Sequence, residues 1–122
     1  AARLVSRCPR CEHITPVLKS LHWLPASARI RYKIALMTFK ILNNLAPVYL
    51  TDLLMPYHPT RGLRSQQQNL LSVPKTRLQR YGDRSFCQQA AMLWNALPID
   101  MRQQMTINTF KRKLKTYLFN CT

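Results

Sequence analysis

Prolines divide this chain into short segments, and that division constrains its fold more than any other feature. Pro16, Pro25 and Pro47 each stand where a helix would begin. A proline fits the first helical position because the N–H that it lacks would have no partner there. Pro98 stands where a helix would end. Between the prolines, apolar residues recur with the three- and four-residue spacing of amphipathic helices. The sequence therefore predicts a mainly α-helical chain.

The longest predicted helix starts at Leu24-Pro25 and continues to about residues 43–44. Its apolar residues lie on two opposite sides when each residue turns by about 100°. One side carries Ile30, Ile34, Met37 and Ile41, and the other carries Tyr32, Ala35, Phe39 and Leu42. A helix that is apolar on two sides is usually central, so we expect neighbours on both. Its basic seam, formed by Arg29, Lys33 and Lys40, fits a solvated edge better than a phosphate track.

Shorter elements flank this helix. Thr15 is expected to cap a helix that runs toward Trp23. Pro47 is expected to begin another short helix. A loop or short-strand insertion is expected near residues 55–80, in which residues 70–73 fit a strand.

Two further amphipathic helices are predicted after this insertion. Asp83 is expected to cap the first, which ends at Pro98, and Thr106 or Asn108 is expected to begin the second. Their apolar faces are Phe86, Ala90, Leu93, Trp94 and Leu97, then Ile107, Phe110, Leu114, Tyr117 and Leu118. We expect one compact domain of about four to five helices over residues 1–122.

The charge of the chain restricts its function. Nineteen Lys and Arg residues stand against four acidic ones, which gives a formal net charge of +15. Such a surface attracts polyanions, so nucleic acid is the expected partner, ahead of an anionic membrane. The acids Glu12, Asp52, Asp83 and Asp100 are far apart in sequence. Metal-dependent phosphoryl transfer and glycoside hydrolysis both need clustered carboxylates. We therefore predict a binding domain, not an enzyme, with no cofactor and no small-molecule substrate.

Cations in the insertion, before the penultimate helix and on the last helix are the expected phosphate contacts. These residues are Arg61, Arg64, Lys75, Arg77, Arg80, Arg84, Lys111, Arg112, Lys113 and Lys115. Tyr57 and Tyr81 lie in basic loop context and are candidates for base stacking, although Tyr81 also fits a turn residue packed on the core. Trp23 and Trp94 lie on apolar faces, so both are expected in the core.

Cysteine and histidine residues suggest two other sites, and neither pattern is complete. Cys8-Pro9-Arg10-Cys11 has the spacing of a zinc half-site that His13 or His22 would extend. A structural zinc site needs a second pair, whereas the remaining cysteines are isolated. A nucleophile needs a histidine base beside it, and no Cys–His pair is adjacent in sequence. We predict no metal site, and we expect His22 to be a structural residue at a helix end.

The sequence leads us to expect neither a membrane span nor a secretory signal at its start. No apolar run approaches the ~20 residues of a membrane span, so a membrane is not an expected partner. The chain begins with Ala1 instead of methionine, and we expect it to be a piece of a longer protein.

Several segments occur in an order typical of one protein family. They are His13-Ile14-Thr15-Pro16, Leu21-His22-Trp23-Leu24-Pro25, Leu45-Ala46-Pro47-Val48-Tyr49-Leu50, Val73-Pro74-Lys75-Thr76-Arg77, Tyr81-Gly82-Asp83-Arg84-Ser85-Phe86, Leu93-Trp94-Asn95-Ala96-Leu97-Pro98 and Lys115-Thr116-Tyr117-Leu118-Phe119. Together they resemble the extreme C-terminal region of the polyprotein of non-LTR (LINE-type) retrotransposons, of the jockey and chicken-repeat kind. Cys8 and Cys11 depart from that pattern.

The resemblance implies a non-catalytic segment that follows an upstream reverse transcriptase domain. Whole family members carry an endonuclease and an RNA-directed DNA polymerase, and the paired aspartates of the polymerase are absent here. The implied role is to hold template RNA or target DNA in a ribonucleoprotein of the cytoplasm and nucleus. Two other interpretations stay open. The segment is a structural domain that packs against the polymerase, or it is a decayed copy without a present function.

Overall fold

Helices dominate the computed structural model, which describes residues 2–9, 12–62, 68–78, 82–103 and 105–121. The helices are α1 (Ala2–Ser6), α2 (Ile14–Ser20), α3 (Ala26–Leu42), α4 (Val48–Thr51), α6 (Phe86–Ala96), α7 (Ile99–Arg102) and α8 (Ile107–Asn120). Within the described ranges, the β-structure is one isolated antiparallel bridge between Pro56 and Leu71. The prediction of a mainly α-helical, compact fold is confirmed. None of the described helices is long and apolar enough to cross a membrane.

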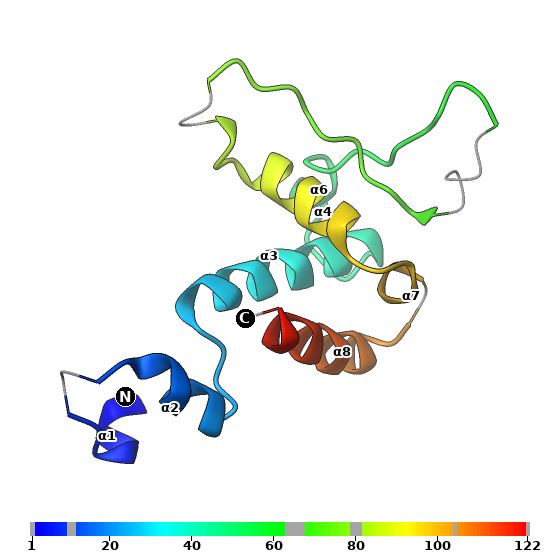
Figure 1. Cartoon of the computed structure of the whole chain (residues 1–122). Helices are drawn as coiled ribbons and strands as arrows, with labels where there is room; N and C mark the ends of the chain where they lie inside the picture. Colours follow the sequence, from blue (N-terminus) through cyan, green and yellow to red (C-terminus); the bar gives the residue numbers. More distant parts are fainter. Residues whose placement is uncertain (1, 10–11, 63–67, 79–81, 104, 122) are drawn as a thin grey trace.

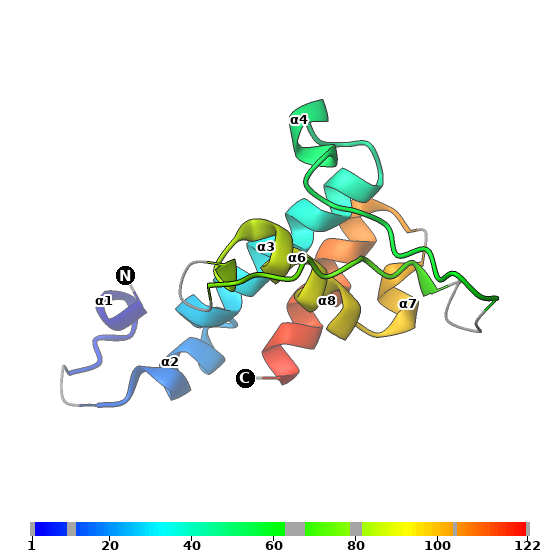
Figure 2. The same ribbon diagram turned by 90° about the horizontal axis from the view of Figure 1, so that it is seen from above.

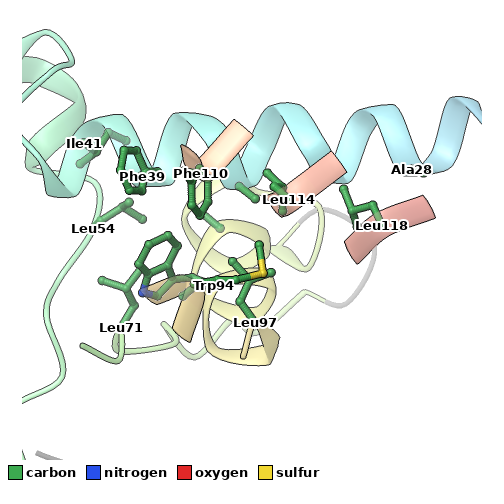
Figure 3. Close-up of a cluster of buried hydrophobic side chains, with 14 of the residues drawn as sticks. Ala28, Phe39, Ile41, Leu54, Leu71, Trp94, Leu97, Phe110, Leu114 and Leu118 are labelled. Atoms are coloured by element: carbon green, nitrogen blue, oxygen red, sulfur yellow. The ribbon is translucent and has the colours of Figure 1, made fainter. Parts of the chain in front are cut away.

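The core forms where α3 packs against both α6 and α8 (Figures 1 and 2). Phe39 of α3 stacks on Phe110 of α8, with ring centroids 4.2 Å apart and planes 14° from parallel. Trp94 of α6 lies against the same phenyl ring at 6.1 Å. Figure 3 shows Phe39, Phe110 and Trp94 grouped together, with Leu114 and Leu118 continuing the core along α8. Three helices are therefore joined through one aromatic cluster.

Only part of the predicted two-sided burial of α3 occurs. The buried residues of this helix are Ala28, Ala35, Thr38, Phe39 and Ile41. Ile30 is 61% exposed and Met37 is 39% exposed, whereas Ile41 of the same side is buried and Ile34 packs against the core, so the expectation that neighbours cover both apolar sides is met only in part. The reason is that α6 and α8 together cover one broad side of α3.

The side chain of Asn95 in α6 anchors the insertion, because it pairs with the backbone of Leu71 as a neighbouring strand would. The Leu71 N–H donates to Asn95 Oδ1 at 2.9 Å, and Asn95 Nδ2 donates to the Leu71 carbonyl at 2.8 Å. On the other side, Tyr57 N–H donates to the Leu70 carbonyl at 2.9 Å. The predicted strand at residues 70–73 thus reduces to one bridge, and Leu71 is buried beneath it.

The predicted helix ends are correct in some places and wrong in others. Thr106 is the N-cap of α8, and its side chain accepts a hydrogen bond from Thr109 N–H at 3.4 Å. His13, not Thr15, is the N-cap of α2, because the helix begins one residue earlier than the predicted cap. Ser85, not Asp83, is the N-cap of α6. The Asp83 carboxylate is instead engaged by side chains of neighbouring segments.

Candidate nucleic-acid interface

The predicted cations of α8 lie on its solvent side. Phe110, Leu114 and Leu118 recur at four-residue intervals and are buried, which fixes the rotation of the helix about its axis. Arg112, Lys113 and Lys115 are consequently exposed, and Lys111 is half-buried at the edge of the core. The rigid helix therefore presents closely spaced cations to solvent, an arrangement that suits phosphate contacts. Arg112 and Lys113 also line an open groove of about 550 Å³ together with Asp100 of α7.

A second group of predicted cations lies just before α6. Lys75, Arg77 and Arg84 are all exposed. Between them, Thr76 Oγ1 lies 3.0 Å from Asp83 Oδ1 and 2.9 Å from Gln88 Oε1. Gln88 Nε2 donates to the same Asp83 oxygen at 3.0 Å. We call the residues around Lys75, Arg77 and Arg84 the basic segment. This network holds the basic segment against the start of α6.

Gly82 is required by the same arrangement. A Cβ at this position would overlap the side chain of Thr76. At Gly62, in contrast, a Cβ would meet nothing within 4 Å. Because Gly82 has no side chain, the backbone at this position can lie directly against the side chain of Thr76.

The remaining predicted site residues belong to the insertion or to its end. Arg61 is exposed, and Tyr57 is 42% exposed beside the bridge at Leu71. Arg64, Arg80 and Tyr81 lie outside the described residues. Base stacking by Tyr57 stays a prediction.

The two tryptophans differ in their surroundings. Trp94 is 2% exposed, and its Nε1–H donates to the Asn69 carbonyl at 2.8 Å, so its placement in the core is confirmed. Trp23 is only half-buried, so the corresponding prediction for it is wrong. It follows the end of α2 in a turn and lines an open groove. Trp23 stands two residues before Pro25 and beyond Ser20, the last residue of α2, so it lies outside a regular helix.

A pocket lies near the C-terminal end of α3. It has a volume of about 260 Å³ and is lined in part by Phe39, Trp94 and Arg102. Arg102 Nη1 donates to the Gln68 carbonyl at 2.9 Å, while its buried Nε atom has no hydrogen-bond partner. Burial lowers the pKa of Arg102. None of the described cations among the predicted phosphate contacts lines this pocket, and Arg102 anchors the insertion to α7.

The predicted zinc half-site near the N-terminus lies only partly within the described residues. Cys11 lies outside the described residues, and Cys8 Sγ lies 3.1 Å from Glu12 Oε2. Across the described part of the chain, no three His, Cys, Asp or Glu side chains are grouped so that they would hold a metal ion.

Comparisons of the chain with protein-family models, with curated proteins and with solved structures found no match.

Proposed function

We propose that this chain is a non-catalytic, basic helical domain that binds RNA or DNA through contacts with phosphates. The observation that carries the proposal is the solvent side of α8, where Arg112, Lys113 and Lys115 are exposed opposite a buried apolar face. Cations on a rigid helix lose less conformational freedom on binding than cations on an unstructured tail. The net charge of +15 would add long-range attraction for any polyanion.

Binding of this kind would have little sequence preference. Phosphate contacts release counterions and fix a protein on the backbone, but they do not read bases. The basic segment before α6 would supply further contacts through Lys75, Arg77 and Arg84, held in place by the network around Asp83. The role proposed for the domain is thus to hold a nucleic acid, and chemistry on that nucleic acid would belong to another domain.

The finer proposal places the chain behind a reverse transcriptase. It rests on the order of sequence segments that resembles the C-terminal region of non-LTR retrotransposon polyproteins. On this proposal, the nucleic acid is template RNA or target DNA, and the upstream polymerase is a partner in the same ribonucleoprotein.

An apolar surface around α4 favours a second function, docking on that polymerase. Val48 is 80% exposed, Tyr49 is 70% exposed and Met55 is 69% exposed, and Leu45 lies nearby on the α3–α4 turn. Exposed apolar residues that gather in one region are typical of protein contacts. The two functions are compatible because α4 and the outer side of α8 lie on different parts of the molecule (Figure 2).

Binding measurements with two double variants test the nucleic-acid proposal. Arg112→Gln/Lys113→Gln removes two cations from α8, and Arg7→Gln/Lys19→Gln removes two exposed cations from the α1–α2 region. We expect the α8 variant to weaken binding to labelled RNA and duplex DNA and to reduce the log–log salt slope by about 2. The control should keep most of the slope. Equal effects of both variants would show that net charge acts without a defined interface and would contradict the proposal.

A further inference from the structure

An open groove between the α2–α3 turn and α8 combines aromatic and basic side chains. We call it the aromatic groove. Its lining residues are His22, Trp23, Leu24, Arg29, Tyr32 and Lys115, and its volume is about 520 Å³. Lys115 belongs to the predicted phosphate contacts, whereas the aromatic residues come from a region of the sequence that no site prediction included. The fold thus brings an aromatic wall beside a cation of the candidate interface.

The turn after α2 builds one wall of the groove. His22 has a left-handed backbone with φ of 53°, which reverses the chain after α2. Trp23 N–H then donates to the Leu18 carbonyl at 2.9 Å and closes the turn. The His22 ring stacks on Phe119 of α8 at 5.7 Å, with planes 7° from parallel. This stack attaches the turn to α8 and fixes the position of Trp23.

The cations of the groove come from the two helices that flank the turn. Arg29 Nε donates to the Leu24 carbonyl at 2.9 Å, which holds the guanidinium across the turn while the residue stays exposed. Lys115 is exposed on the facing helix, α8. Trp23 and Tyr32 are both half-buried, so part of each ring remains accessible from the groove.

We propose that the aromatic groove binds single-stranded nucleic acid, with bases stacked on Trp23 and Tyr32 and phosphates on Arg29 and Lys115. Accessible aromatic rings beside cations are the elements with which proteins bind single strands. A duplex offers phosphates to the cations, but its bases are already stacked on one another and cannot enter the groove. This inference rests on the proposed function and goes further, since it names the single strand as the preferred ligand.

The intrinsic fluorescence of the full chain tests the groove without any substitution. The chain has two tryptophans, and Trp94 is sealed in the core, so a nucleic acid that quenches the emission acts on Trp23. We expect oligouridine to quench part of the emission at saturation. A duplex of equal length and heparin, a polyanion without bases, should bind with little quenching. Equal quenching by heparin or by the duplex would overturn the proposal.

Affinity measurements on variants give a second test. Trp23→Ala and Tyr32→Ala should each weaken oligouridine binding roughly fivefold or more, since stacking of a base on an aromatic ring contributes that much. Tyr49→Ala, an exposed tyrosine on α4, is the matched control and should bind as the wild type does. Trp23→Phe keeps an aromatic ring in the turn and should lose less affinity than Trp23→Ala. Circular dichroism verifies that each variant is folded.

The outcomes separate this inference from the proposed function. Salt-dependent binding of oligouridine without quenching, and without an effect of Trp23→Ala or Tyr32→Ala, would refute the groove and leave the phosphate contacts intact. Absence of binding to any nucleic acid by the folded chain would refute both.

Discussion

The rings of Phe39 and Phe110 stack with their centroids 4.2 Å apart, and this contact joins the longest helix to the last one. Both side chains are almost fully buried. Because Trp94 also lies on Phe110, removal of this ring would leave a cavity at the contact of α3, α6 and α8.

Phe110→Ala should therefore lower the free energy of unfolding by about 3–5 kcal/mol, from the lost burial and the cavity together. Denaturation by urea, followed by circular dichroism, measures the change. Tyr49→Ala removes an aromatic ring from the surface and should alter the stability by no more than about 0.5 kcal/mol. Comparable losses for the two variants would contradict the placement of Phe110 at the centre of the core.

The two glycines offer a comparison within one chain. Gly82→Ala should destabilise the fold by about 1–3 kcal/mol, because the added methyl group overlaps Thr76 and forces the basic segment away from α6. Gly62→Ala adds a methyl group in open space and should cost little. Thermal unfolding of both variants checks this difference. A Gly82→Ala protein as stable as Gly62→Ala would show that the basic segment is not held against α6.

The side chain of Asn95 should contribute to the stability of the fold. Asn95→Ala leaves the N–H and the carbonyl of buried Leu71 without their side-chain partner, at a cost of about 1–3 kcal/mol. Hydrogen exchange should show faster exchange of the Leu71 amide in this variant. Asn108→Ala, at an exposed position of α8, is the control. Unchanged exchange at Leu71 would mean that the Asn95 amide is not its partner.

Alkaline pH should destabilise the protein in part through Tyr117. Burial raises the pKa of Tyr117, and the charge of Cys121 and a hydrogen bond with it raise the pKa further. The folded state therefore keeps the phenol proton at a pH where the unfolded state has lost it. Stability falls as the pH rises through the ordinary tyrosine pKa of about 10.

Tyr117→Phe should remove that part of the fall, while the titration of lysines affects both proteins alike. Urea denaturation of the two proteins between about pH 8 and about pH 11 measures the difference. Parallel pH profiles would show that folding does not perturb the Tyr117 proton.

The sequence predicted the elements whose apolar residues recur over several turns. Helix α8 is an example, because Phe110, Leu114 and Leu118 specify one buried side and thereby the outward direction of its cations. Helix α7 spans only Ile99–Arg102, which is too short for any period to appear, and it was not predicted.

The misassignments arise where contacts, not periodicity, decide the environment. Trp23 was assigned to a helix face, yet α2 ends at Ser20 and the backbone turn at His22 places the indole at a groove. Ile30 has the correct spacing for burial but is 61% exposed. The proximity of Trp23 to Lys115 depends on how α8 packs, which no local pattern in the sequence contains.

The salt dependence of binding tests the central claim most directly. The folded chain is titrated into labelled duplex DNA and labelled RNA at several salt concentrations. If about six of the proposed cations meet phosphates, the logarithm of the binding constant for duplex DNA should fall with the logarithm of salt concentration at a slope of about −5. A slope close to zero, or no binding by a chain whose helices are intact, would contradict the proposal that this domain holds nucleic acid.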